Sequence, residues 1–307
     1  MGVLFALAAT LSCSSGSGDS GRITENYVFS SLPIDILFVM DNSGNMQTYT
    51  ADILAHAGAT LSRLASKSYQ FRCAVTGTDA YANTASKTEF SKKSGEAIIT
   101  PQTIDYLDMF ESNLNLGLYG SGTERPLESM RSALSSPFNQ GYNLPGSNAF
   151  LAIIFIGNED DQPITTPVSD YIRYLENLTG TSPARKACAA FSLSVINPET
   201  QLSGETISTR VSELCSALDG FTRDLHETDY SAVFSAFADS MASLASPIRL
   251  GSLPDTTTIQ VTVNGQGVSR SETDGWEYVE SANSISFRGA GIPAIGSSVK
   301  VTYMTAL

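Results

Sequence analysis

The sequence predicts a doubly wound, mostly parallel α/β sheet followed by a small antiparallel β domain at the C-terminal end. Residues 36–40 and 150–156 are apolar without alternation, which is typical of strands buried on both faces of a parallel sheet. Segments with apolar residues at helical spacing separate the predicted strands, as in βαβ units. From Pro254 onward the pattern changes to short alternating runs, which are typical of antiparallel strands.

The predicted elements follow one another in the order that a doubly wound sheet requires. A helix follows the first strand, because Ile53, Ala57, Leu61 and Leu64 share one helical face. We expect residues 79–96 to form an exposed, mobile excursion before a short edge strand. A final helix carries a stripe of aromatic and aliphatic side chains that predicts packing against the sheet. The remaining predicted strands cover residues 71–78, 97–99, 191–196 and 221–225, and the remaining helices cover residues 103–114 and 205–218 and begin at Pro126.

The C-terminal fifty residues predict a small sandwich or barrel. Ile259, Val261 and Val263 alternate with polar residues, and Asn264-Gly265 is a strong type I′ hairpin signal. A β domain of this size is marginally stable by itself. The predicted domain organisation is a signal segment at residues 1–13, a linker at 14–31, the α/β domain at 32–248 and the β domain at 249–307.

Composition limits the class of partner. The chain has 307 residues, of which 42% are hydrophobic and 16% are charged, as expected of a folded protein. Its formal net charge of −13 argues against binding to nucleic acid, which depends on neutralising phosphates with Lys and Arg. An acidic surface instead favours cations.

The first residues predict export. Residues 2–11 are apolar but too short to span a bilayer, so they are typical of a signal peptide core. With Cys13 and the flexible stretch after it, the segment resembles a bacterial lipoprotein signal, in which the cysteine is acylated. The resemblance implies a lipid-anchored protein of the cell envelope, in the outer membrane or periplasm. Thr10, and the lack of Lys or Arg before Arg22, depart from that pattern, and ordinary secretion is the alternative.

An exported protein can form disulfides. Cys188 comes just before a predicted strand, and Cys215 lies near the end of the helix that follows it. A helix that leaves the top of a strand returns to its bottom, so the two thiols should meet. We therefore predict a Cys188–Cys215 disulfide, with Cys73 as a buried free thiol.

Three oxygen-bearing side chains follow the first strand at alternate positions: Asp41, Ser43 and Asn45. Ligands in open α/β sheets lie at the carboxyl ends of the strands, and one carboxylate with neutral oxygens suits Mg²⁺, Mn²⁺ or Ca²⁺. The segment resembles the first metal loop of von Willebrand factor type A (vWA) domains, Asp-x-Ser-x-Ser, with Asn45 in place of the last Ser. The alternative is a helix cap, for which Asn and Ser are also suited.

The resemblance implies two further metal loops. Thr123 matches the threonine of the second loop, in a Gly-rich stretch that lacks the Lys of a phosphate-binding loop. Asn158 stands where the family has Asp in the third loop, and Asp160 is a candidate substitute. Three consecutive acids, residues 159–161, are unfavourable unless solvent or a cation relieves them. An exposed acidic turn is the alternative there.

By resemblance, the function is adhesive. Hydroxyl and amide oxygens bind the cation, Mg²⁺ or else Mn²⁺ or Ca²⁺, and an acidic side chain of a protein partner completes its coordination. The resemblance makes Ser43 and Asn45 direct ligands and Thr123 a direct or water-bridged one, whereas Asp41 and Asn158 hold waters. The alternative is a structural envelope protein whose site has decayed and binds no metal.

The residues give no sign of an enzyme. His56 and His226 are the only histidines, and no Gly-x-Ser-x-Gly motif occurs. A phosphatase that used Asp41 as nucleophile would need an acid two residues later, where Ser43 stands. We expect both histidines to be structural.

Overall fold

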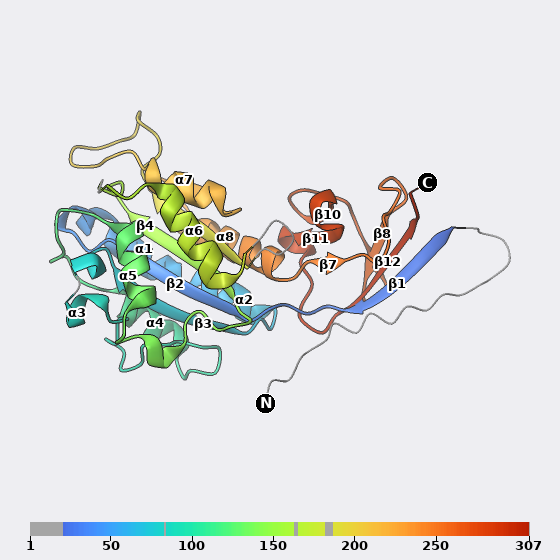
Figure 1. Cartoon of the computed structure of the whole chain (residues 1–307), viewed down its shortest axis with the longest axis horizontal. Coiled ribbons are helices and arrows are strands. Elements are labelled where there is room, and N and C mark those ends of the chain that lie inside the picture. The colour runs from blue at the N-terminus through green and yellow to red at the C-terminus, as the bar shows by residue number, and fades with distance from the viewer. Residues whose placement is uncertain (1–20, 83, 163–164, 182–186, 307) are drawn as a thin grey trace. The chain divides into compact units, whose positions relative to one another are not determined.

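The computed structural model describes residues 21–82, 84–162, 165–181 and 187–306 (Figure 1). The chain divides into two compact units. One unit is Leu32–Met241, and the other combines Met1–Ser31 with Ala242–Leu307. In the described part of the chain, no helix is both long and apolar enough to cross a membrane. The predicted lipidation site, Cys13, lies outside the described residues.

The unit Leu32–Met241 contains the predicted parallel sheet, in the order β3-β2-β4-β5-β6. All four ladders are parallel. The predicted vWA-like or Rossmann-like α/β fold class is therefore confirmed. The strands are β2 (Ile34–Met40), β3 (Phe71–Gly77), β4 (Phe150–Gly157), β5 (Cys188–Ser194) and β6 (Thr222–Asp224).

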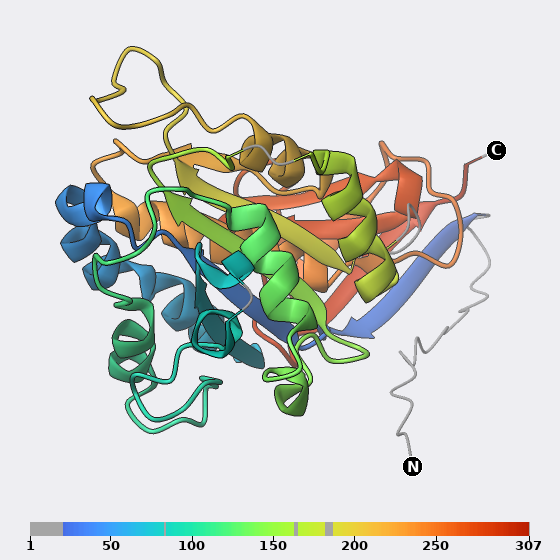
Figure 2. The same cartoon turned by 60° about the vertical axis from the view of Figure 1, so that its left-hand side comes forward.

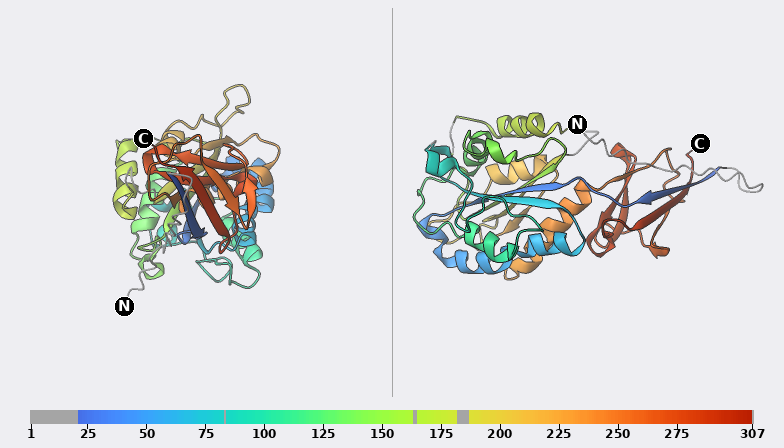
Figure 3. Two further views of the ribbon diagram at one scale, coloured as in Figure 1. Left: turned by 90° about the vertical axis from the view of Figure 1, so that its right-hand side faces the viewer. Right: turned by 90° about the horizontal axis from the view of Figure 1, so that it is seen from below.

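Helices cover both faces of this sheet (Figures 2 and 3). The strands β2, β4 and β5 are therefore buried along their whole lengths. On one face, Phe38 contacts Phe110 at a ring distance of 4.8 Å, and Phe191 contacts Phe237 at 5.4 Å. The helices of this face are α1 (Gln47–Ala57), α2 (Ala59–Ser66), α4 (Tyr106–Leu114) and α8 (Tyr230–Ala245). Those of the other face are α5 (Pro126–Ser135), α6 (Val168–Thr179) and α7 (Arg210–Ala217).

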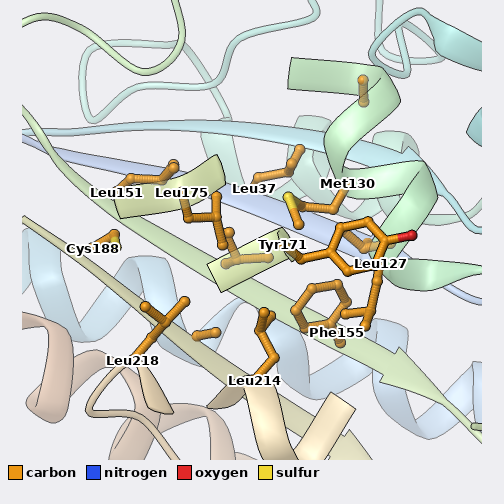
Figure 4. Packing of buried hydrophobic residues seen from close by; sticks show 14 of the residues in the cluster. Leu37, Leu127, Met130, Leu151, Phe155, Tyr171, Leu175, Cys188, Leu214 and Leu218 are labelled. Atoms are coloured by element: carbon orange, nitrogen blue, oxygen red, sulfur yellow. The ribbon is translucent and has the colours of Figure 1, made fainter. Parts of the chain in front are cut away.

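The core of the second face joins three helices to the sheet (Figure 4). Met130 of α5, Tyr171 of α6 and Leu214 of α7 are fully buried against Leu37 and Phe155 of the strands. Removing apolar surface of this extent from water is the main stabilising contribution to such a fold. The core fixes the helices that begin near the carboxyl ends of the strands.

The segment between β3 and α4 differs from its prediction. The edge strand at 97–99 is present as an antiparallel bridge between Cys73 and Ile99. The prediction of an exposed excursion at residues 79–96 holds only in part: Lys92, Lys93 and Glu96 are exposed, whereas Ala80 and Phe90 are buried. Asn139 accepts a hydrogen bond from the Phe90 amide at 3.0 Å. This segment carries the turn η2 (Ala80–Ala82) and the helix α3 (Ala85–Thr88).

The predicted Cys188–Cys215 disulfide is wrong, because Cys73, Cys188 and Cys215 are free and buried thiols. The sulfur of Cys188 accepts a hydrogen bond from the Thr181 hydroxyl at 3.3 Å. The Cys215 thiol lies near Thr222, whose register partner on β5 is Ser192 rather than Cys188. A strand rises about 3.3 Å per residue, so the two thiols lie at different heights along β5, whereas a disulfide needs Cα atoms within about 7 Å.

The other unit contains two antiparallel sheets, as predicted for the C-terminal region. The expected hairpin joins β8 to β9, and both turn residues, Asn264 and Gly265, have positive φ, as a type I′ turn requires. One sheet has the order β1-β12-β8-β9, and the other β10-β11-β7. Their strands are β1 (Arg22–Val28), β12 (Ser298–Met304), β8 (Gln260–Val263), β9 (Gln266–Val268), β10 (Gly275–Val279), β11 (Ser284–Arg288) and β7 (Ile248–Arg249).

The strand β1 corrects the prediction of a linker at residues 14–31. It pairs with β12 from Arg22↔Met304 to Val28↔Ser298, and it lies beside the red and orange C-terminal strands in Figure 3. The alternation of β1 is concealed because Glu25 occupies an inward position and is 4% exposed. Its carboxylate accepts hydrogen bonds from the Tyr303 hydroxyl and, at 3.0 Å, from the Gly251 amide. A charged residue in a buried position therefore masked the strand.

Candidate metal centre

The candidate site lies where the strand order reverses. The chain passes from β2 to β3 on one side, and β4 lies on the other side of β2. Such switch points are where ligands bind in open α/β sheets. The Asp41 amide donates to the Ile156 carbonyl at 2.8 Å, which places the loops after β2 and β4 side by side. A Cβ on Gly157 would lie 3.0 Å from the Asp41 Cβ, so this close approach needs glycine.

Asp41 and Ser43 form the centre of the site. Asp41 is 1% exposed and Ser43 is 2% exposed. Oδ1 of Asp41 accepts a hydrogen bond from the Ser43 amide at 2.7 Å. Oδ2 of Asp41 and Oγ of Ser43 are buried without a well-aligned hydrogen-bond partner. Such groups are unfavourable in a folded protein unless another ligand meets them.

The helix-cap alternative does not describe Ser43. Ser43 occupies the N-cap position of the 3-10 turn η1 (Gly44–Met46), but its side chain makes no capping hydrogen bond. The helix α1 that follows has Met46 at its N-cap and also lacks a side-chain cap. The hydroxyl of Ser43 therefore remains available to a ligand.

Asn158 joins the same site from the end of β4. It is 1% exposed, and its Oδ1 has no well-aligned partner. Its carbonyl accepts a hydrogen bond from the Thr206 amide at 3.1 Å, which holds the loop in place. The structure thus brings together three of the predicted residues, Asp41, Ser43 and Asn158, each with an unpaired oxygen.

The loop that contains Thr123 is held against the first loop. The Gly120 amide donates to the Asn42 carbonyl at 2.8 Å, and a Cβ on Gly120 would approach the Asn42 main-chain carbon at 2.9 Å. The Thr123 amide donates to Ser121 Oγ at 3.0 Å, and the Ser121 amide donates to the Asp79 carboxylate at 3.2 Å. Thr123 itself is partly buried. The second loop therefore lies beside the first loop.

Asn45 lies at the rim rather than at the centre. Its side chain is exposed, and its Nδ2 donates to Glu159 Oε1 at 3.3 Å and to the Gly204 carbonyl at 3.4 Å. These contacts are made by Nδ2, whereas Oδ1 is the atom that would bind a cation. Asn45 thus links the first loop to Glu159 of the third loop.

Asp160 does not belong to the site, which corrects its assignment as a substitute ligand. Its carboxylate accepts hydrogen bonds from the Thr209 hydroxyl at 2.5 Å and from the Arg210 amide at 3.1 Å. It therefore caps the N-terminal end of α7, where a negative charge is favourable. The neighbouring Asp161 is also engaged, by the Arg210 guanidinium at 2.9 Å and the Leu127 amide at 3.1 Å.

Glu124 is the residue of this site that the sequence did not reveal. It is 1% exposed, and neither carboxylate oxygen has a well-aligned partner. With Asp41 and Glu159 it lines one small cavity, about 10 Å³ in volume, among apolar residues such as Phe155. In the sequence it resembles an ordinary acid at the start of α5, so no local signal distinguishes it.

The acids perturb one another. Burial, together with the charge of Asp41, raises the pKa of Glu124 to about 8. Burial also raises the pKa of Asp41 to about 6, against the hydrogen bond from the Ser43 amide, and the charge of Glu159 adds to the rise. A cation at this place would relieve both the burial of charge and the repulsion.

The donor set fits a hard cation better than zinc. Within the described ranges, no three His, Cys, Asp or Glu side chains form a metal-binding group. The unpaired atoms are carboxylate, hydroxyl and amide oxygens, which Mg²⁺, Mn²⁺ and Ca²⁺ prefer. Asp41, Ser43 and Asn158 would hold such an ion, and Thr123 lies in the adjoining loop.

Both histidines have structural partners. His226 lies between Asp224 Oδ1, 2.9 Å from its Nδ1, and Glu205 Oε2, 3.2 Å from its Nε2. His56 Nδ1 is 2.8 Å from the Asp52 carbonyl oxygen.

No family model and no curated protein matches this chain. Among solved structures, a pilus adhesin from Lactobacillus rhamnosus GG is similar over 92% of this chain and 41% of its own, with 11% identity and a TM-score of 0.48. A von Willebrand factor type A protein from Catenulispora acidiphila is similar over 93% of this chain and 61% of its own, with 12% identity and a TM-score of 0.42.

Proximal thread matrix protein 1 from the mussel byssus, solved with a zinc-occupied MIDAS motif, is similar over 68% of this chain and 48% of its own, with 8% identity and a TM-score of 0.42. The chain thus spans less than two thirds of each of these three proteins. The function proposed below rests on the site and not on these likenesses.

Proposed function

We propose that this chain is an exported, lipid-anchored protein-binding module of the adhesion type, which uses a divalent cation to bind an acidic side chain of a partner. The observation that supports it is the group of buried, unpaired oxygens on Asp41, Ser43 and Asn158 at the switch point of the sheet. When bound, the cation would supply an open coordination position for a carboxylate. No catalysis is proposed.

The chain's own residues prepare this position. The Ser43 amide fixes one oxygen of Asp41, and the other has no well-aligned hydrogen-bond partner. Main-chain hydrogen bonds hold the second and third loops in place, through Gly120 and Asn158 respectively. The loops therefore present neutral and charged oxygens without first having to rearrange, which lowers the entropy lost on binding.

Calorimetric titration of the whole chain with Mg²⁺, Mn²⁺ and Ca²⁺ tests the proposal. We expect saturable heat for the wild type, at least tenfold weaker cation binding for Asp41→Ala, and no change for Asp52→Ala, an exposed acid on α1. Capture of an envelope protein should be lost with a chelator and with Asp41→Ala. A wild type without saturable heat would instead support the alternative, a structural envelope protein with a metal-free site.

A further inference from the structure

Glu124 is a buried acid without a counter-charge. Among the acids in the described part of the chain, only Glu124 and Asp41 have buried oxygens that lack a well-aligned hydrogen-bond partner. Other buried acids are paired: Asp35 lies 2.6 Å from the Arg72 guanidinium, and Asp161 lies 2.9 Å from Arg210. Since an unpaired charge in the interior is strongly unfavourable, Glu124 is stable as a carboxylate at neutral pH only where a cation meets it, and it otherwise holds a proton.

The backbone, not the carboxylate, fixes the position of Glu124. Its carbonyl accepts a hydrogen bond from the Gln162 amide at 2.8 Å, and the Gln162 side chain donates to Glu159 Oε2 at 3.2 Å. Glu124 is thereby tied to the third loop, beside Asn158. Its side chain lines the same cavity as Asp41, and neither carboxylate oxygen has a well-aligned hydrogen-bond partner. The neighbouring Thr78 side chain lowers the pKa of this carboxyl, but it carries no charge that would balance it.

The charges of the site then balance. The third loop contributes an uncharged amide to the site, on Asn158. Asp41 and Glu124 together carry two negative charges, which match one divalent cation. Glu159 is less available, because it is partly exposed and hydrogen-bonded to Asn45 and Gln162.

We propose that Glu124 is a ligand of the divalent cation, directly or through one water, and that it supplies the negative charge that Asn158 lacks. This inference rests on the cation of the proposed function, but not on any partner. It assigns the second loop two contributions, the hydroxyl of Thr123 at the border of the site and the carboxylate of Glu124 within it.

Titration of the whole chain with Mn²⁺, together with thermal unfolding in chelator and in Mn²⁺, tests the assignment. Glu124→Gln should bind Mn²⁺ at least tenfold more weakly than the wild type and lose most of the rise in Tm that Mn²⁺ causes. In chelator, its Tm should equal or exceed that of the wild type, since Gln has the same shape and buries no charge. Glu111→Gln, the same change at an exposed position of α4, is the matched control.

Glu124→Asp keeps the charge on a shorter side chain, so it should retain more Mn²⁺ affinity than Glu124→Gln. It also provides a second test if the Gln variant does not fold. Affinity of Glu124→Gln within twofold of the wild type overturns the inference, and leaves the proposed function intact if Asp41→Ala still loses binding. If cation binding depends on Glu124 but chelator does not affect partner capture, the inference is supported and the adhesive function is rejected. A wild type that binds no cation overturns both.

Discussion

The site is defined by single oxygen atoms rather than by a charged cluster. Asn158 has nearly the shape of the Asp that the vWA pattern places there, yet it changes the charge of the third loop. Glu124 lies in another loop and faces the same cavity as Asp41. Two acids buried together without a cation bind protons more tightly than they would in water. The free protein should therefore be sensitive to pH in a range where most surface carboxylates are not.

In chelator, the stability of the chain should fall as the pH rises from about 5 to about 8. Burial raises the pKa of Asp41 from 3.8 to about 6, and that of Glu124 from 4.5 to about 8. The folded state therefore holds protons that the unfolded state has released, and it loses this advantage as the pH passes through the raised values, at about 1.4 kcal/mol per unit of pKa shift.

Circular dichroism melts at pH 5 and pH 8 measure this effect as a lower Tm at the higher pH. A saturating divalent cation at pH 8 should reverse the loss. Glu124→Gln should make the profile flatter. A wild-type Tm that rises over this interval would show that the two carboxylates are not destabilising when ionised.

At the scale of elements, one turn after β4 serves three purposes. Asn158 faces the site, Asp160 caps α7, and Asp161 joins the start of α5 to Arg210. Consecutive residues of a turn point in different directions, so each acid meets a different neighbour. The start of α7 stabilises the charge of Asp160, and the Arg210 guanidinium and the start of α5 stabilise that of Asp161. The sequence showed that these charges needed relief but not which neighbour supplied it.

Asp160→Ala should destabilise the chain by about 1–2 kcal/mol, as the loss of a helix cap does, and leave the cation affinity within twofold of the wild type. The reason is that the Asp160 carboxylate accepts hydrogen bonds from Thr209 and from main-chain amides of α7. Urea unfolding and the Mn²⁺ titration measure the two quantities. A tenfold loss of affinity without a change in stability would return Asp160 to the list of ligands.

At the scale of the whole molecule, the two ends of the described chain form one β unit. The strand β1 pairs with β12 through seven registered residue pairs. Glu25 accepts hydrogen bonds from the Tyr27 and Tyr303 hydroxyls and the Gly251 amide. Loss of β1 would remove the acceptor of the Tyr303 hydroxyl and the Gly251 amide and expose one edge of β12. The β unit therefore depends on a segment that precedes the α/β unit in the sequence.

A chain that begins at Leu32 should lose the fold of the β unit and keep its cation site. Trp276 is the only tryptophan, is 3% exposed and belongs to the β unit, so its fluorescence reports on that unit alone. We expect its emission to shift to the red in the truncated chain, while the Mn²⁺ titration remains within twofold of the full chain. Native emission after truncation would show that β1 is dispensable.

The sequence by itself determined where the strands lie along the chain, the helices between them and the oxygen-bearing loop after the first buried strand, because these depend on near neighbours and on the apolar period. Asp41, Ser43 and Asn158 follow buried strands, and the parallel sheet necessarily brings those strand ends together. Only the tertiary structure decided where Glu124 and Asp160 point, which thiols stay apart and which strand pairs with β12. These features depend on contacts between residues far apart in the chain, and a buried charge or a turn leaves no periodic pattern from which such contacts can be predicted.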